Sequence, residues 1–195
     1  MNLAIIKYNA GNIRSVAFAL ERLGLSYTIT DHPEEIIKAD KVIFPGVGEA
    51  NATMRYLKDK KLDQVIKGLR QPVLGICLGM QLLCAYSEEN DTPCLGIFNE
   101  QVKKFQPHNH EKVPHMGWNS ITFTESWMDS SVADKFVYFV HSYYVPVNAH
   151  TSAITEYIQP FSAALQKNNF FAVQFHPEKS ADVGEKILHS FLKVT

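Results

Sequence analysis

The first half of the sequence alternates short apolar runs with segments of helical spacing, and this pattern constrains the fold most. Strands are expected at Leu3–Ile6, Ser26–Thr30, Lys41–Phe44 and Val73–Ile76. Such short apolar runs suit strands that are buried on both faces. Strands that alternate with helices through short connections are parallel. The pattern therefore predicts an α/β fold with an open, mostly parallel twisted sheet flanked by helices.

The expected helices are marked by apolar stripes and by residues that begin or end a helix. Asn12 can cap a helix whose apolar residues recur from Ile13 to Leu23, and Gly24 ends it. Further helices are expected from Pro33, at Leu62–Leu69 and at Leu78–Tyr86.

The second half changes to short strands, many of which alternate apolar and polar residues. These strands are expected at Val102–Phe105, Ser120–Phe123, Phe136–Val140, Ala153–Tyr157, Ala163–Gln166 and Phe170–Phe175. Asn168-Asn169 has the chemistry of a hairpin turn, and Ser180 caps a last helix. No linker interrupts the sequence, so we expect a single domain over residues 1–195 with an antiparallel extension in the C-terminal half.

Composition excludes several classes of function. The 195 residues carry 19 Lys+Arg against 20 Asp+Glu, a net charge of −1, which gives no general attraction to nucleic acid or to an anionic membrane. The longest near-apolar run, Val73–Met80, is far below the ~18 residues of a membrane span. We therefore expect a cytoplasmic protein with neither nucleic acid nor membrane as a partner.

The cysteines and histidines predict no metal site and no cofactor. Cys77, Cys84 and Cys94 are an odd number without a pairing pattern, and their spacing does not fit zinc. His108–Glu111 is expected to be a solvated loop, since no further ligands cluster beside it in the sequence.

Gly75-Ile76-Cys77-Leu78-Gly79 has the pattern of a nucleophile elbow between a strand and a helix. The turn is sharp, so the flanking positions need glycine. Cys77 would sit at a helix N-terminus, which favours a thiolate, and the Leu78 N–H would be placed to hold an oxyanion. The competing interpretation is a buried structural cysteine in a βα turn.

His176-Pro177-Glu178 offers the base and the orienting carboxylate that a thiolate nucleophile needs. Pro177 favours an extended backbone at His176, and in an extended segment residues i and i+2 point to the same side. Together with Cys77, these residues form a candidate Cys–His–Glu triad.

Three further segments are candidates for a substrate pocket. The Pro45-Gly46-Val47-Gly48 turn frees backbone N–H groups that bind anions or supply a second oxyanion donor. Gln81 lies one helical turn after Cys77, on the same face. His141-Ser142-Tyr143 ends an apolar strand abruptly, as in a pocket wall.

Taken together, these signatures resemble the class I, triad-type glutamine amidotransferases. They are Pro-Gly-x-Gly at 45–48, Gly-x-Cys-x-Gly-x-Gln at 75–81, the His141 segment and His-Pro-Glu at 176–178. Longer segments resemble the glutaminase subunits of imidazole glycerol phosphate synthases, which act in histidine biosynthesis. They are 8–12 with 14–16, 44–48, 114–119, 138–143 and 176–180.

This resemblance implies roles for individual residues. It makes Cys77 the nucleophile, His176 the base and Glu178 the orienting group. Positions that match the substrate pocket are Gly46, Gly48, Gln81, His141, Ser142 and Tyr143, with Val47 and Leu78 beside the oxyanion. Positions that match a face toward the synthase are Asn12, Met116, Trp118, Tyr138 and Lys179.

The resemblance also implies a partner. That partner is a separate (β/α)8 barrel cyclase or synthase, which forms a heterodimer with the glutaminase and uses the ammonia released from glutamine. Glutaminase activity is then low until the barrel is bound and carries its ribonucleotide. Lys7, Asn9 and Glu49 depart from the residues usual in this family.

Three alternatives stay open from the sequence alone. The first is a glutaminase that serves another synthase, such as the anthranilate or aminodeoxychorismate systems, although the anthranilate glutaminase typically has Pro-Gly-Pro-Gly in the glycine turn. A free-standing thiol hydrolase would use the same triad. A non-enzymatic interaction module would have no need of an intact Cys77, His176 and Glu178.

Overall fold

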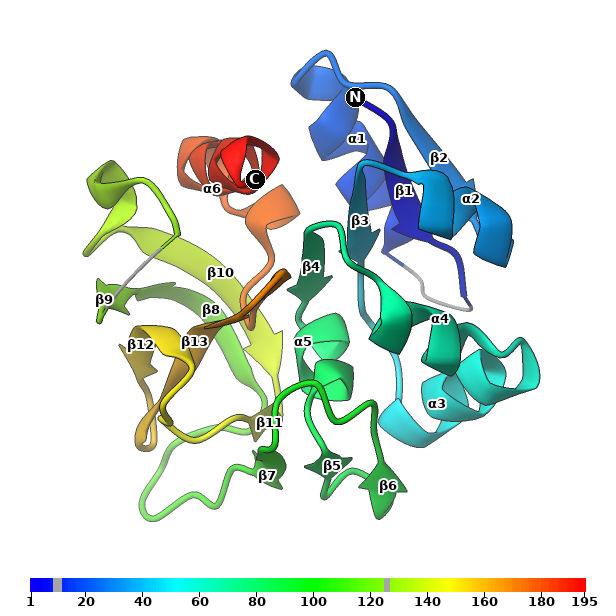
Figure 1. Cartoon of the computed structure of the whole chain (residues 1–195). Helices are drawn as coiled ribbons and strands as arrows, with labels where there is room; N and C mark the ends of the chain where they lie inside the picture. The colour runs from blue at the N-terminus through cyan, green and yellow to red at the C-terminus, as the bar shows by residue number, and fades with distance from the viewer. Residues whose placement is uncertain (9–11, 125–126) are drawn as a thin grey trace.

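An eight-stranded sheet forms the centre of the protein (Figure 1). The structure is a computed structural model that describes residues 1–8, 12–124 and 127–195. In spatial order the strands are β2 (Tyr27–Thr30), β1 (Leu3–Ile6), β3 (Lys41–Phe44), β4 (Val73–Ile76), β14 (Phe170–Val173), β13 (Pro160–Lys167), β12 (Thr151–Glu156) and β9 (Thr122–Phe123). The first five run parallel, and β14, β13, β12 and β9 pair antiparallel. The predicted α/β class with an antiparallel extension is confirmed.

Helices cover both faces of the parallel strands. On one face lie α1 (Ile13–Arg22) and α6 (Ala181–Lys193), and on the other lie α2 (Pro33–Lys38), α3 (Ala50–Asp59), α4 (Leu62–Gly68) and α5 (Leu78–Leu83). Two short 3₁₀ helices are η1 (Ser130–Val132) and η2 (Pro177–Lys179). Alternate residues of β1 face opposite sides, Ile5 toward α1 and Ile6 toward the other layer, as burial on both faces requires. Within the described part of the chain, no helix is long and apolar enough to cross a membrane.

The end of α1 follows the sequence closely. Gly24 takes the left-handed backbone at φ +71°, and its N–H donates to the carbonyl of Glu21 at 2.9 Å. The Leu25 N–H donates to the carbonyl of Leu20 at 3.0 Å. These two bonds form a Schellman motif, which is why glycine ends the helix at this point.

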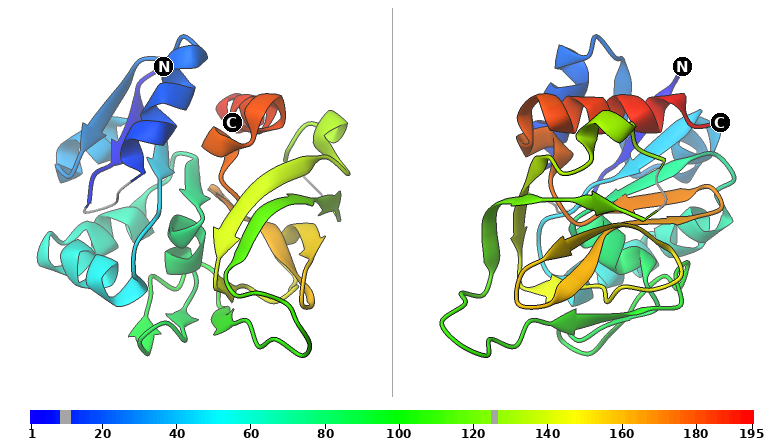
Figure 2. Two further views of the ribbon diagram at one scale, coloured as in Figure 1. Left: turned by 180° about the vertical axis from the view of Figure 1, so that it is seen from behind. Right: turned by 90° about the vertical axis from the view of Figure 1, so that its left-hand side faces the viewer.

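Among the described residues, six further strands lie outside the main sheet. A ribbon joins β8 (His115–Ser120) to β10 (Phe136–His141), and a four-stranded sheet has the order β11 (Tyr143–Tyr144), β7 (Gln101–Lys104), β5 (Tyr86–Ser87) and β6 (Thr92–Pro93). Figure 2 shows α6 passing over the ribbon. The His176 N–H donates to the Tyr138 carbonyl at 2.9 Å, so the ribbon is held against the segment that carries the predicted base.

Several predicted boundaries were wrong because long-range pairing decided them. The helix expected to reach Tyr86 ends at Leu83, since Tyr86 and Ser87 pair with Gln101 and Val102. The strand expected at 120–123 is split at Ile121: Ser120 pairs with the ribbon and Thr122 with β12. The strand expected at 170–175 ends at Val173.

The two predicted capping residues stand at helix starts but do not cap with their side chains. Ser180 precedes α6, yet its hydroxyl donates to the His176 carbonyl at 2.7 Å and accepts from the Tyr138 N–H at 3.0 Å. Asn12 precedes α1, and its amide is turned toward Glu178. The side chains of Ser180 and Asn12 therefore make tertiary hydrogen bonds instead of capping their own helices.

Helix α3 was not predicted, and Glu49 explains its start. The Glu49 carboxylate accepts hydrogen bonds from the N–H groups of Asn51 and Ala52 at 2.7 and 2.8 Å, and the Asn90 side chain donates to it at 2.8 Å. The departure from the family pattern at position 49 is thus a helix cap with its negative charge at the helix N-terminus.

We expect Glu49→Ala to lower the free energy of unfolding by about 1 kcal/mol, because two helical N–H groups lose their acceptor. Urea denaturation of the two proteins measures this difference. Glu34→Ala is the control, since Glu34 is exposed in the first turn of α2. An equal loss in both variants would contradict the capping role.

Candidate active site

Cys77 stands at the junction of β4 and α5 with a strained backbone. Its φ is +52°, in the region that residues with a Cβ rarely adopt. The turn is packed directly on the end of β3: a Cβ on Gly79 would lie 2.1 Å from the Phe44 carbonyl oxygen. The glycine is needed because two backbones meet here, and the turn presents the Cys77 side chain at the end of the sheet.

The strand order brings the base to the nucleophile. β4 and β14 are parallel neighbours that end together, with Ile76 opposite Val173, and the Cys77 N–H donates to the Val173 carbonyl at 2.8 Å. His176 follows three residues later. Residues almost a hundred positions apart therefore meet at the carboxyl ends of adjacent strands, where α/β folds place their ligands.

His176 and Glu178 form a buried pair. His176 Nδ1 lies 2.8 Å from Glu178 Oε1, and both side chains have 0% exposure. His176 is extended as expected, at φ −102° and ψ 95°, but Glu178 lies in η2 rather than in an extended segment. The tight turn after Pro177, and not strand alternation, sets the carboxylate beside the imidazole.

The charges around His176 favour its protonated form. Burial alone disfavours the charged ring, but the neighbouring Cys77 thiolate and the Glu178 carboxylate outweigh it and raise the pKa of His176 to about 10. His176 Nε2 is buried and has no hydrogen-bond partner among the described residues. The ring thus has one nitrogen held by Glu178 and the other free to exchange a proton.

Asn12 belongs to this buried group, contrary to the expectation that it faces a partner. Its side chain is 6% exposed. Its Nδ2 donates to Glu178 Oε1 at 2.5 Å and lies 3.3 Å from His176 Nδ1. An asparagine at a helix start pointed to capping, and the resemblance implied a partner-facing position; neither signal indicated a contact with Glu178. Asn9, the neighbouring departure from the family pattern, lies outside the described residues.

We expect Asn12→Ala to lower kcat for glutamine roughly tenfold with little change in KM, because the carboxylate that orients His176 loses a charge-assisted hydrogen bond. Asn12→Asp should lower kcat further, since it sets a second carboxylate against Glu178. Steady-state kinetics of the assembled enzyme measure both parameters, with Asn51→Ala on α3 as the control. An unchanged kcat in Asn12→Ala would show that the contact with Glu178 has no role in catalysis.

A cavity of about 310 Å³ opens over Cys77. Its lining contains most of the predicted pocket residues, namely Val47, Gly48, Cys77, Leu78, Gln81, His141, Ser142 and Tyr143. Gly46 contributes backbone behind this wall, where a Cβ would lie 2.4 Å from the Gly79 nitrogen. Three further lining residues, Glu89, Pro114 and Val140, were not predicted for the pocket. Pro114 and Val140 stand in segments that carry the family resemblance, whereas Glu89 stands in no motif.

The predicted oxyanion donors are not free in this structure. The Leu78 N–H donates to the Gly46 carbonyl at 3.4 Å. In a trans peptide the C=O and the following N–H point in opposite directions, so the Val47 N–H is directed away from Leu78. A rotation of the Gly46–Val47 peptide would release the Leu78 N–H and turn the Val47 N–H toward it.

A chain of polar contacts fixes the wall that carries His141. His141 Nδ1 donates to the Tyr143 carbonyl at 2.7 Å, and His115 Nδ1 lies 3.2 Å from His141 Nε2. Burial lowers the pKa of His141 to about 3 and that of His115 to about 4. Both rings are therefore neutral near pH 7, and His141 does not compete with His176 as the base.

Four of the five predicted partner-facing residues gather around the β8–β10 ribbon. Met116 is 64% exposed and Trp118 53% exposed. Trp118 packs edge-on against Tyr138 with ring centroids 6.0 Å apart, and the Lys179 ammonium lies 5.9 Å from the centroid of the Tyr138 ring. Phe136, 59% exposed, extends this surface. A cluster of exposed aromatic and Met side chains is typical of an interface.

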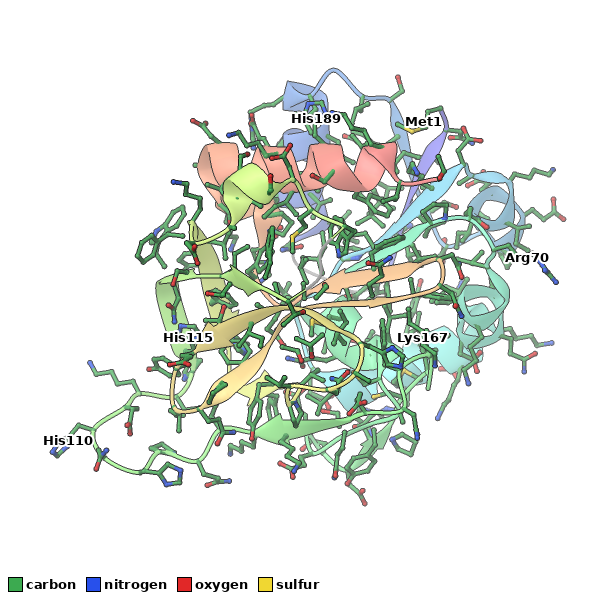
Figure 3. The ribbon with its side chains drawn as sticks, turned by 60° about the vertical axis from the view of Figure 1, so that its left-hand side comes forward. Met1, Arg70, His110, His115, Lys167 and His189 are labelled. Atoms are coloured by element: carbon green, nitrogen blue, oxygen red, sulfur yellow. The ribbon has the colours of Figure 1, made fainter. Side chains whose placement is uncertain are left out.

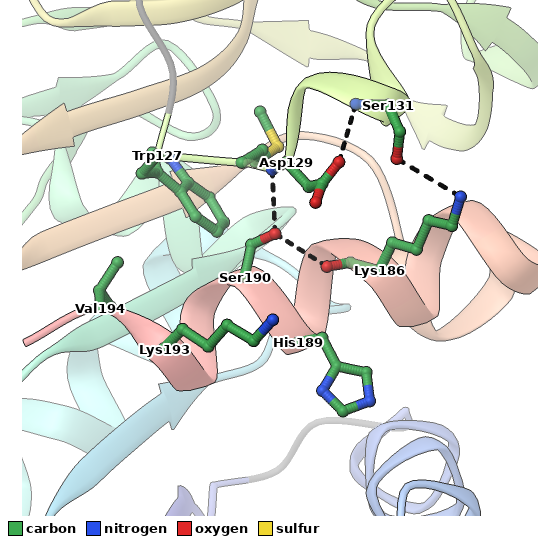
Figure 4. Close-up of a pocket in the computed structure, with 9 residues that line it drawn as sticks. Trp127, Asp129, Ser131, Lys186, His189, Ser190, Lys193 and Val194 are labelled. Carbon is green, nitrogen blue, oxygen red and sulfur yellow. Dashed lines mark hydrogen bonds between the residues drawn. The ribbon is translucent and has the colours of Figure 1, made fainter.

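Two other features lie apart from Cys77. Figure 3 shows His110 in a projecting loop, where the Glu111 carboxylate accepts from the His108 and Asn109 N–H groups. A larger cavity, about 820 Å³, lies between residues 127–131 and α6, and Figure 4 shows side chains that line it. This cavity shares no lining residue with the one over Cys77.

Comparison with known proteins identifies the class. The chain belongs to the glutamine amidotransferase class-I family, whose model matches residues 4–194. A subunit from Bacteroides fragilis (strain YCH46), "Imidazole glycerol phosphate synthase subunit HisH", is 61% identical over 196 residues and is covered over 100% of both chains. A HisH subunit from Idiomarina loihiensis is 46% identical, covering 100% of this chain and 99% of its own. Within the class, the chain is thus a member of the HisH family, as the sequence resemblance predicted.

Solved structures share the fold at low sequence identity. A "glutamine amidotransferase" matches with a TM-score of 0.75 and 16% identity over 97% of each chain. "PurLQS from Thermotoga maritima" matches with a TM-score of 0.71 and 15% identity, covering 98% of this chain and 97% of that one.

Proposed function

We propose that this member of the HisH family hydrolyses glutamine to glutamate and ammonia through a thioester on Cys77, and delivers the ammonia to the synthase subunit of imidazole glycerol phosphate synthase in histidine biosynthesis. The observation that carries this proposal is the cavity over Cys77, with the buried His176–Glu178 pair adjoining the same cysteine. A nucleophile, a base and an orienting carboxylate are the set that covalent acyl transfer needs.

The reaction proceeds by exchange of one proton through His176. The Cys77 thiolate attacks the side-chain amide carbon of glutamine, and protonated His176 gives its proton to the departing ammonia. Neutral His176 then takes a proton from water, which attacks the thioester and releases glutamate. Glu178 holds Nδ1 throughout, so Nε2 carries the proton that moves.

An oxyanion forms in both halves of this reaction. Leu78 N–H and Val47 N–H are the donors that would hold it, and each is worth about 2.7–4 kcal/mol in comparable enzymes. Because Leu78 N–H bonds to the Gly46 carbonyl, the resting chain lacks this stabilisation. Low activity of the isolated subunit follows, and the bound synthase would favour the turned peptide.

Glu89 gives the cavity a preference for the α-ammonium group of glutamine. Its carboxylate lines the cavity and accepts from the Ala50 N–H at 2.8 Å. Burial raises the pKa of Glu89, because its carboxylate is incompletely solvated in the charged form. A substrate cation beside the carboxylate would stabilise that charged form. Glutamine bound this way has its side-chain amide free to extend toward Cys77.

The ribbon surface supports a protein partner. We assign Met116, Trp118, Tyr138 and Lys179 to contact with a (β/α)8 barrel synthase in a heterodimer. Ammonia would leave beside Tyr138, whose strand is bonded to His176, and so reach the synthase without becoming ammonium in water. Residues 1–195 act as one domain of this cytoplasmic enzyme.

Glutaminase assays with and without the barrel synthase and its ribonucleotide test the proposal. We expect low turnover by the isolated chain and strong stimulation by the liganded barrel. Absence of stimulation, together with turnover of γ-glutamyl peptides by the chain alone, would favour a free-standing thiol hydrolase. Stimulation by an anthranilate or aminodeoxychorismate synthase instead would assign the chain to a different partner.

A further inference from the structure

Gln174 is a fully buried polar residue that the mechanism above does not use. It follows β14 directly, and its side chain is 0% exposed. Its Nε2 lies 3.6 Å from Cys77 Sγ, and its Oε1 accepts a hydrogen bond from Gln81 Nε2 at 3.1 Å. Gln174 does not line the cavity, so it reaches the sulfur from the protein interior.

The orientation of this amide is fixed by its neighbours. The Tyr143 carbonyl can only accept, so Gln81 must present its nitrogen there, at 3.0 Å. The same nitrogen faces Gln174, which must therefore present its oxygen to Gln81. The remaining group of Gln174, its Nε2, is left facing the sulfur of Cys77. A flipped Gln174 would set a carbonyl oxygen against the sulfur and an N–H against Gln81 Nε2.

The Tyr143 carbonyl, from which the orientations of Gln81 and Gln174 were deduced, is itself held in place by a further hydrogen bond. His141 Nδ1 donates to it at 2.7 Å, and His115 backs His141 at 3.2 Å. His141 and Gln81 thus both donate to the Tyr143 carbonyl, and from Gln81 the donors run through Gln174 to Cys77. The side chains of His115, His141, Gln81 and Gln174 are all buried. Reversing one link would leave a buried donor or acceptor unsatisfied, which is costly in a low-dielectric interior.

We propose that Gln174 is a positioning residue that holds Cys77 Sγ in its rotamer and favours the thiolate by donating an N–H to it. The inference rests on the proposed role of Cys77 as the nucleophile. An N–H donor binds a thiolate more strongly than a neutral thiol, so it lowers the free energy of the reactive form. Because it comes from behind the cysteine, it leaves the cavity side of the sulfur open to substrate.

The pH dependence of Cys77 alkylation by iodoacetamide tests this inference, with peptide mapping to follow each cysteine of the full chain. Gln174→Leu removes the donor and keeps the bulk, and we expect the midpoint of the rate profile to rise by about one pH unit, a tenfold slower reaction below both midpoints. Gln174→Glu places a carboxylate beside the sulfur and should raise the midpoint further. Gln166→Leu, at an exposed position on β13, is the matched control.

Cys84 serves as an internal monitor of unfolding. Because it is fully buried, iodoacetamide reacts with it only if a substitution loosens the structure around it. Midpoints that stay at the wild-type value in both variants, with Cys84 protected, would overturn the proposal and leave Gln174 a packing residue. If Gln174→Leu exposes Cys84, the midpoint measured for the isosteric Gln174→Glu variant tests the proposal instead. The assay needs no glutamine, so a shifted midpoint, together with a lack of glutamine hydrolysis even in the complex with the liganded barrel synthase, would reject the proposed function and retain the contact of Gln174 with Cys77.

Discussion

We expect Cys77→Ala to abolish glutamine-dependent synthesis, while the same complex should still make product from added ammonium. Loss of the nucleophile of a covalent mechanism lowers turnover by at least ~10⁴-fold. Alanine keeps the Cβ that the left-handed backbone at φ +52° already accommodates, so the fold should survive. Parallel assays of product formation with glutamine and with ammonium separate the two steps.

The other two cysteines are matched controls for this experiment. Cys84 is fully buried and Cys94 partly exposed, and neither lines the cavity over Cys77. Cys84→Ala and Cys94→Ser should keep kcat, although the first creates a small void and lowers stability. Glutamine turnover by Cys77→Ala at a rate near that of the wild type would reject the thioester mechanism.

Gly79→Ala is expected to cost the protein both its stability and its glutaminase activity. The added methyl would lie 2.1 Å from the Phe44 carbonyl oxygen and 3.4 Å from that of Pro45. Both are backbone atoms, so the end of β3 and the start of α5 must separate. We expect the free energy of unfolding to fall by at least ~3 kcal/mol, at the upper end of single-residue effects, because the two turns that form the cavity share this contact.

Gly68→Ala is the control for the same chemical change. No atom lies within 4 Å of a Cβ at Gly68, which ends α4 on the surface. Alanine is the better helix former by roughly 0.5–1 kcal/mol, so this variant should be neutral or more stable. Urea denaturation and glutamine turnover of both variants give the comparison. A Gly79→Ala protein within ~1 kcal/mol of the wild type would refute the close packing of the two turns.

The sequence predicted best those elements whose residues decide their own structure. Lys41–Phe44 and Val73–Ile76 were placed at their observed bounds, because Asp40 and Pro45 flank the first, and Pro72 and the Gly75–Gly79 elbow motif delimit the second. Helix α3 was missed since its cap is a glutamate and its exposed face is polar. The split of the strand at Ile121 depends on two different pairing partners, which periodicity cannot reveal.

In the candidate site, too, the residues with a local signal were predicted and those placed by long-range packing were not. Cys77, His176 and Glu178 stand in short motifs with local chemical meaning. Asn12 and Gln174 carry no motif, and their contacts arise only when distant strands and helices pack together. One signal was present for Gln174, a polar residue inside the apolar run Phe170–Phe175. A buried polar side chain requires a partner, and here that partner includes the nucleophile.

The pairing of β4 with β14 also determines at what stage of protein synthesis Cys77 and His176 can come together. Cys77 and Gln174 are 97 positions apart, and β14 occupies the place between β4 and the antiparallel strands. A ribosome delivers the N-terminal half first, so the elbow is made long before His176 emerges. A partly synthesised chain therefore carries Cys77 without a base, and its proposed triad is complete only after β14 and the His176–Glu178 segment have left the ribosome and packed beside β4.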